Sequence, residues 1–155
     1  MKREDIRIRD PYIVAADGVY YMYSSTGSLD GTTVVVYRST DLEEWDEPTE
    51  VYKLDTSTWK SRELWAPEVH CYMGKYYLFL SILGKGGKRG TEISVSDTPE
   101  GPFVPIADHP ATPEDKSSAM NIITIPIILF LLGFSLKHAH AIRQLPIIVR
   151  PLFKG

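Results

Sequence analysis

An internal repeat of about 56 residues is the feature that most constrains how this 155-residue chain can fold. Residues 17–21 (DGVYY) in the first copy correspond to residues 73–77 (MGKYY) in the second, and a proline precedes each motif, at Pro11 and Pro67. Later motifs match in the same order, with two residues gained in the second copy. Such ordered matches indicate a supersecondary unit that occurs twice and buries its apolar surface by stacking on its neighbour.

Each copy has the pattern of about four β-strands. Residues 19–24 and 75–81 are rich in tyrosine and other residues that favour strands. Asp17-Gly18 and Met73-Gly74 each lie between short apolar runs, as hairpin turns do. No window shows a sustained helical stripe with caps. We therefore predict an all-β structure for residues 1–115, with each repeat forming a unit the size of a propeller blade.

A change in composition near Asp115 divides the chain. All 20 acidic residues, 3 tryptophans and 9 tyrosines lie in residues 1–115, which carry 12 Lys and Arg and hence a net charge of −8. Residues 116–155 carry 5 Lys and Arg and no acid. We predict an incomplete β-propeller domain at residues 1–115, followed by an unrelated apolar and basic tail at residues 116–155.

Two interpretations of this tail remain open. Because the change is abrupt and the repeat pattern does not resume, the tail is interpreted as out-of-frame or otherwise unrelated sequence. The alternative is a membrane anchor, since residues 119–136 are 18 residues without a charge. Pro126 and Gly133 weaken that alternative. The first residues lack the apolar segment of a secretory signal, so a cytoplasmic location is expected.

Charge and cysteine content argue against several classes of protein. The net charge of −3 gives no global electrostatic support for a nucleic-acid partner. Cys71 is the single cysteine, and no Cys and His cluster suggests zinc, so no metal or cofactor is expected. Residues 84–90 (GKGGKRG) superficially suggest a phosphate-binding loop, but the spacing differs and no helix follows, which favours a loop between strands.

Two short motifs carry side chains suited to carbohydrate chemistry. Asp10 precedes Pro11, and a residue before proline is expected to be extended. It is either a turn aspartate that accepts a backbone N–H or, in a propeller, an acid that faces the central channel. Trp65 and Glu68 lie at the corresponding place in the second repeat, where an indole can stack on a sugar and a carboxylate can bond its hydroxyls. Trp65 could equally be a core residue between blades, and His70 is interpreted as a half-buried strand histidine.

Together these motifs resemble glycoside hydrolase family 43 over about residues 6–115. The matching segments are RDPYI at 9–13, STDLEEW at 39–45, WAPEV at 65–69, GKYY at 74–77 and SDTPEGPF at 96–103. The resemblance implies a five-bladed β-propeller, of which this chain would hold the two N-terminal blades. It also implies hydrolysis of an arabinose- or xylose-containing oligosaccharide or polysaccharide, with inversion at the anomeric carbon.

The resemblance further implies roles for individual residues. Asp10 matches the general base of the family, and Trp65 with Glu68 would line the sugar subsite. Inversion also needs a general acid, roughly 6.5–9.5 Å from the base. The family places that acid and a pKa-modulating aspartate in later blades, whereas this sequence has no acidic residue after Asp115, so Glu63 or Glu68 would have to substitute. We therefore expect a shortened and inactive glycosidase polypeptide.

Two further readings stay open. The first is a noncatalytic carbohydrate-binding β-module with a C-terminal membrane anchor at residues 119–136. Hydrolysis with inversion would favour the glycosidase, whereas glycan binding and membrane fractionation without turnover would favour the module. The second is a misfolded translation product without activity.

Overall fold

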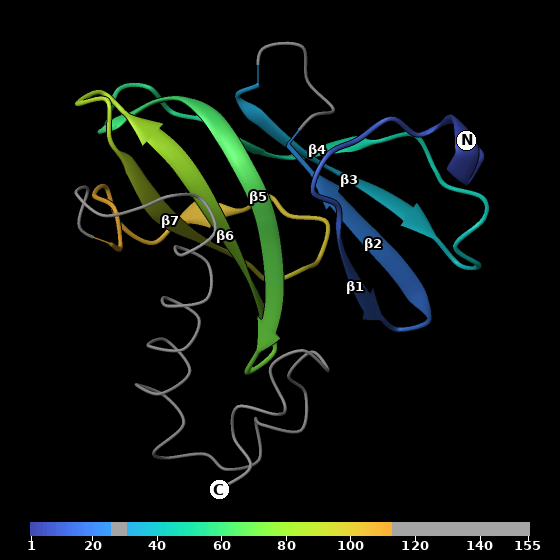
Figure 1. Ribbon diagram of the computed structural model, residues 1–155. Coiled ribbons are helices and arrows are strands. Elements are labelled where there is room, and N and C mark those ends of the chain that lie inside the picture. The colour runs from blue at the N-terminus through green and yellow to red at the C-terminus, as the bar shows by residue number, and fades with distance from the viewer. Residues whose placement is uncertain (26–30, 113–155) are drawn as a thin grey trace, which may run out of the picture.

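The computed structural model describes residues 1–25 and 31–112. The first sheet contains β1 (Tyr12–Ala16), β2 (Val19–Ser24), β3 (Thr33–Ser39) and β4 (Thr49–Lys53). The second contains β5 (Lys60–Tyr72), β6 (Lys75–Gly84), β7 (Arg89–Ser96) and β8 (Val104–Pro105). In each sheet, every strand pairs antiparallel with the next strand along the chain. The sheets lie side by side with β1 near β5 (Figure 1), which confirms the predicted all-β fold with four strands in each repeat.

The tail predicted at residues 116–155, including the anchor considered at 119–136, lies outside the described residues. In the described part, the one helix is a short 3₁₀ turn, η1 (Arg3–Asp5). No described helix is long and apolar enough to cross a membrane.

The two predicted hairpin turns are present and have the same geometry. Asp17 and Gly18 have φ values of 51° and 78°, and Met73 and Gly74 have φ values of 49° and 76°. Positive φ at both central residues is what a two-residue type I′ turn requires, and its twist matches that of the flanking strands. The turns bring Val19 opposite Ala16, and Lys75 opposite Tyr72. The repeat therefore encodes the same hairpin twice.

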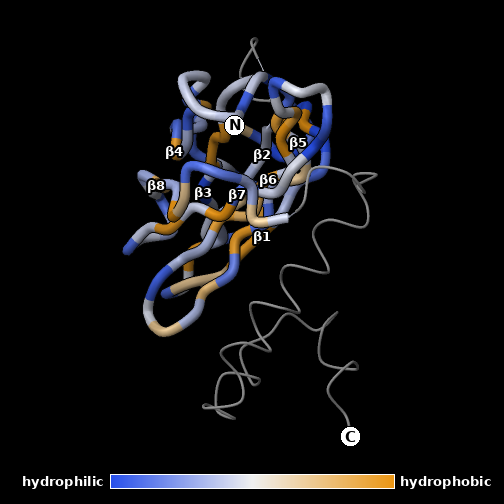
Figure 2. Tube along the Cα trace, turned by 90° about the vertical axis from the view of Figure 1, so that its left-hand side faces the viewer, coloured by the Kyte–Doolittle hydropathy of each residue, from blue (hydrophilic) through white to orange (hydrophobic). Residues whose placement is uncertain are grey.

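The main core lies between the two sheets. Along β2, Tyr21 and Tyr23 belong to the core that faces the second sheet, whereas Met22 packs in a separate cluster on the other face. The second sheet contributes Leu78 and Leu80 from β6 to the shared core. This alternation follows from the period of two along a strand, and hydrophobic segments follow the strands of both sheets (Figure 2). Each such buried side chain stabilises the fold by about 1.5–3 kcal/mol.

Two loops at equivalent places in the repeats connect the third and fourth strands of each sheet, at residues 40–48 and 97–103. In the first, Asp41 Oδ1 accepts the N–H groups of Glu43 at 2.8 Å and Glu44 at 2.9 Å. These bonds favour the charged carboxylate and lower the pKa of Asp41. In the second loop, Ser96 Oγ accepts the Thr98 N–H at 3.2 Å.

The second loop also ties the two sheets together. Phe103 is buried in the shared core, with its ring centroid 6.2 Å from that of Tyr23, and its N–H donates to Val51 O at 2.8 Å. Gly101 approaches the same carbonyl: a Cβ there would lie 2.9 Å from Val51 O, and its φ is 73°. Glycine is therefore needed for this loop to reach the first sheet.

A buried ion pair joins β5 and β7 of the second sheet. Lys60 Nζ lies 2.6 Å from Glu92 Oε2, and each side chain is 2% exposed. Lys60 also donates to the Tyr52 hydroxyl at 3.3 Å, and Ser94 Oγ donates to Glu92 Oε1 at 3.1 Å. Burial, reinforced by the Glu92 carboxylate, raises the pKa of Tyr52 far above its ordinary value. The network joins β4 of the first sheet to β5 and β7 of the second.

Candidate functional site

Asp10 lies in a bend immediately before β1, and its side chain is exposed. Our expectation of extended geometry was wrong, because Asp10 has a φ of 49°. A left-handed backbone also avoids the right-handed helical region that Pro11 disfavours at the preceding residue. Aspartate adopts the left-handed conformation more readily than most residues do. Ala66, before Pro67 in the second repeat, has a φ of 47°. Both repeats therefore bend in the same way before their equivalent strand positions.

The carboxylate of Asp10 differs from those of the turn aspartates. Asp41 and Asp55 each accept backbone N–H groups two or three residues further along the chain. Within residues 1–25 and 31–112, no hydrogen bond or ion pair engages the Asp10 carboxylate. No residue in this part of the chain therefore supports a turn-capping role for Asp10.

The first strands of the two sheets meet through a hydrogen-bonded row of side chains. The Tyr12 hydroxyl lies 3.4 Å from His70 Nδ1, and His70 Nε2 lies 3.3 Å from Glu68 Oε2. The His70 ring also packs edge-on against Phe79, with centroids 5.6 Å apart. No local sequence pattern predicts this contact, because Tyr12 and His70 are 58 residues apart and belong to different sheets.

The partners of His70 indicate one tautomer. An ionised Glu68 can only accept, so in a neutral His70 ring facing it Nε2 is the donor to Glu68 and Nδ1 accepts from the Tyr12 hydroxyl. Burial, with a smaller effect of the Glu68 carboxylate, raises the pKa of Tyr12 far above its ordinary value, which keeps this hydroxyl protonated. The predicted half-buried strand histidine is confirmed, because His70 lies in β5 with its side chain 15% exposed.

Trp65 is not a core residue, because 42% of it is exposed. Within the described residues, Trp65 is therefore not buried between the two blades. One face of its ring is covered by Arg89, whose guanidinium carbon lies 3.2 Å from the ring centroid. Arg89 comes from the last part of the glycine-rich segment 84–90, and the structure confirms that this segment connects two strands, β6 and β7. The sequence contained no signal that this arginine would reach Trp65.

The two glutamates considered as substitute acids are both engaged by other side chains. Glu63 lies 3.4 Å from Arg62 Nε and 3.3 Å from Arg89 Nη2, and its own φ is 59°. Glu68 is held by His70. Within the described residues, no group of three or more His, Cys, Asp and Glu side chains could hold a metal ion.

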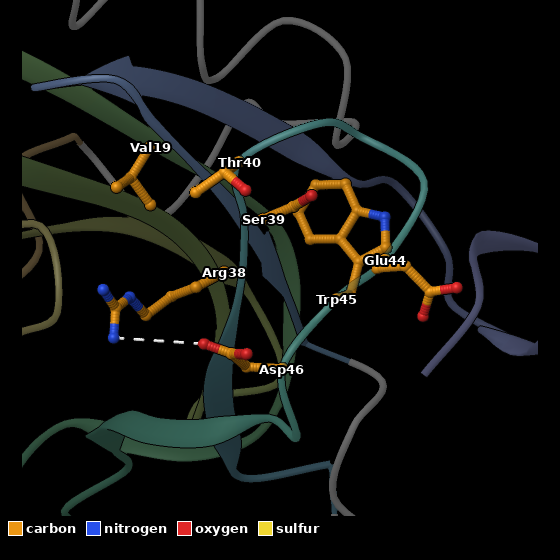
Figure 3. Close-up of a pocket in the computed structure, with 7 residues that line it drawn as sticks. All are labelled: Val19, Arg38, Ser39, Thr40, Glu44, Trp45 and Asp46. Carbon is orange, nitrogen blue, oxygen red and sulfur yellow. Dashed lines mark ion pairs between the residues drawn. The ribbon is translucent and has the colours of Figure 1, made fainter.

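A polar hollow of about 310 Å³ lies elsewhere on the first sheet (Figure 3). Two of its charged side chains are paired within the protein, since Arg38 lies 4.0 Å from Asp46, and Arg38 also lies 2.7 Å from Glu100. None of the predicted site residues lines this hollow. It is therefore separate from the region of Asp10, Trp65 and Glu68, whose roles remain predictions.

Comparison with known proteins assigns the class. Two stacked four-stranded blades form part of a β-propeller, of the kind found in glycoside hydrolases. Residues 5–121 match the family model described as glycosyl hydrolases family 43. The chain therefore belongs to this family.

The relatives have names that agree with this assignment. A xylosidase/arabinosidase 43A of Humicola insolens is 32% identical over 116 residues, which are 65% of this chain and 36% of that protein. An endo-arabinase from Bacteroides thetaiotaomicron matches with a TM-score of 0.66 and 34% identity, over 74% of this chain and 39% of that one. A family 43 β-xylosidase/α-arabinofuranosidase from a compost metagenome, solved with xylotriose, matches with a TM-score of 0.59 and 27% identity, over 68% and 36% of the two chains. The chain thus spans little more than a third of the length of these relatives.

Proposed function

We propose that this chain supplies the general base and part of the sugar-binding surface of an inverting glycoside hydrolase that acts on arabinose- or xylose-containing glycans. The observation that carries the proposal is the state of Asp10. It matches the aspartate-proline position of the family's base, it is exposed, and no described residue engages its carboxylate. Such a carboxylate can accept a proton from a water molecule that attacks the sugar.

The sugar-binding part of the proposal depends on Trp65 and Glu68. Trp65 offers an exposed aromatic surface to the C–H groups of a pentose. Glu68, whose side chain is 26% exposed, is oriented by His70 and offers carboxylate oxygens to hydroxyl groups. The substrates of the relatives support the choice of pentose, since their names include xylosidase and arabinosidase.

We further propose that these 155 residues alone do not hydrolyse a natural glycan. Protonation of a poor leaving group by a general acid contributes roughly 10²–10⁴-fold to the rate. The sequence has no acidic residue after Asp115, and Glu63 and Glu68 are held by other side chains. An aryl glycoside with a good leaving group needs less protonation, so any residual activity is expected there first.

The test compares the wild-type chain with Asp10→Asn, which keeps the side-chain shape and removes the base. Asp5→Asn is the matched control, because Asp5 is also an exposed aspartate near the N-terminus. We expect no turnover of xylotriose, and slow hydrolysis of 4-nitrophenyl xyloside or arabinofuranoside that disappears only in Asp10→Asn. Activity that survives in Asp10→Asn would refute the base. Rapid hydrolysis of xylotriose by wild type would refute the missing acid and assign that role to Glu63 or Glu68.

A noncatalytic carbohydrate-binding module is the second candidate, and the exposed Trp65 favours it. This candidate predicts saturable binding of xylotriose, lost in Trp65→Ala, with no hydrolysis of either aryl glycoside. Nuclear magnetic resonance of the products distinguishes the two functions, because an inverting enzyme releases the anomer opposite to that of the substrate.

A further inference from the structure

We propose that Arg89 is a positioning residue that holds the Trp65 indole ready to stack on a sugar ring. This inference rests on the proposed function, since it assigns Trp65 a ligand. It assigns Arg89 no direct contact with that ligand, because Arg89 is only 9% exposed. Arg89, the first residue of β7, thereby supports the sugar-binding surface without being part of it.

The first step of the argument is the irregular backbone around Trp65. The pairing of β5 with β6 shifts register between Lys60 and Arg62, between Arg62 and Leu64, and between Trp65 and Glu68. Such bulges leave residues unpaired and bend the strand. Trp65 therefore lies in a stretch that the ladder of backbone hydrogen bonds supports only in part.

Arg89 provides the missing support at this point. Its Nη1 donates to Glu63 O at 3.1 Å and to Ser81 O at 3.3 Å, and its Nη2 lies 3.3 Å from Glu63 Oε2. Ser81 is the residue opposite Trp65 in β6. One guanidinium thus connects the bulged strand to the partner of Trp65 while it covers one face of the indole.

The chemistry of this contact suits arginine rather than lysine. A guanidinium is planar and weakly hydrated, so it can stack on an indole and donate several hydrogen bonds in its own plane. A cation over a tryptophan face is attracted most strongly when it is desolvated, as Arg89 is. With one face occupied, the remaining exposed surface of Trp65 is available to a ligand in a set orientation.

Holding the ring in advance increases affinity, because a mobile side chain must lose rotamer freedom when it binds. Loss of this preorganisation is expected to weaken binding roughly 2- to 10-fold. The effect should pass entirely through Trp65. In a Trp65→Ala background, Arg89→Lys should therefore change sugar affinity no further.

The experiment uses the full chain labelled with 5-fluorotryptophan, which gives one fluorine signal for each of its 3 tryptophans. Trp65→Phe and Trp45→Phe assign two of the signals, and the signal of Trp45, which is buried against the first sheet, reports that the fold is intact. Arg89→Lys is compared with Arg62→Ala. Arg62 is the matched control, because it also pairs with Glu63 but is 68% exposed. Affinity is measured by titration with xylotriose.

We expect Arg89→Lys to shift or broaden the Trp65 signal in the free protein and to weaken xylotriose binding 2- to 10-fold, while Arg62→Ala changes neither. An unchanged Trp65 signal in Arg89→Lys would overturn the positioning role, and this readout does not depend on a ligand. A Trp65 signal in wild type that does not respond to xylotriose would overturn the ligand assignment, and with it the sugar-binding part of the proposed function. Arg89→Ala is the more severe variant, and Arg89→Lys decides the question if the alanine variant does not fold.

Discussion

Replacing Lys60 with methionine is expected to destabilise the protein by about 3–5 kcal/mol, because it leaves a buried carboxylate without its cation. Lys60 Nζ is 2.6 Å from Glu92 Oε2, and both side chains are 2% exposed, so water cannot replace the lost partner. After the substitution, the Ser94 hydroxyl at 3.1 Å still donates to Glu92, but it is neutral and does not replace the lost cation. Because small domains are typically stable by only about 5–15 kcal/mol, this loss is a large fraction of the total.

The double variant Lys60→Met/Glu92→Leu separates the charge from the packing. Replacing both members of a buried ion pair with apolar residues removes the carboxylate that Lys60→Met leaves without a cation. The double variant also takes a hydrogen-bond partner from the Ser94 and Tyr52 hydroxyls, but a buried hydroxyl without a partner costs less than a buried charge without one. We therefore expect the double variant to be more stable than Lys60→Met alone by at least about 1 kcal/mol.

Urea unfolding followed by circular dichroism measures these differences, with Lys53→Met as the control. Lys53 is an exposed lysine in β4, close to the buried pair in sequence, and its replacement should change stability by less than about 0.5 kcal/mol. Lys60→Met and Glu92→Leu are also measured singly. If the sum of their two effects on the free energy of unfolding equals the effect of the double variant within about 0.5 kcal/mol, the reasoning is refuted. Such additivity would mean that Lys60 and Glu92 contribute independently rather than as a pair.

Three further predictions concern the loops. Backbone N–H groups lower the pKa of Asp41 below its value of 3.8 in the unfolded chain, so its stabilising effect is fully present above about pH 4 and is lost as pH falls through the folded-state pKa. Asp41→Asn should consequently lower the thermal midpoint at pH 7 and progressively less at acid pH, whereas Asp108→Asn should change it at neither. Gly101→Ala should cost about 1–3 kcal/mol in urea unfolding, more than Gly87→Ala, because both have positive φ but only Gly101 has a backbone carbonyl within 2.9 Å of the new Cβ. Phe103→Ala should cost about 3–5 kcal/mol in the same assay, since Phe103 is 4% exposed and fills the core between the sheets; a change below 1 kcal/mol would show that the second loop does not hold them together.

Local features of the fold could be predicted because neighbouring residues encode them. Asp17-Gly18 and Met73-Gly74 specify their hairpins through positive φ at two adjacent positions. The tyrosine-rich segments 19–24 and 75–81 form β2 and most of β6, as their strand-favouring residues indicated. The repeat and the order of its motifs were sufficient to indicate two blades and family 43. The roles of Asp10, Trp65 and Glu68 were also proposed from sequence and remain to be measured.

The contacts that define the candidate site were decided by tertiary structure. Arg89 reaches Glu63 across 26 positions in sequence, and Tyr12 reaches His70 across 58. These contacts depend on the register shifts of β5 and on the angle between the sheets, and both are set by packing of the whole core. The bend at Asp10 was likewise missed, because the rule for residues before proline describes local preference, whereas the left-handed φ is held in place by the surrounding fold. Sequence patterns thus determined the strands and their turns. Only the packed sheets determined which side chains meet across them, because that depends on distances between segments that no local pattern contains.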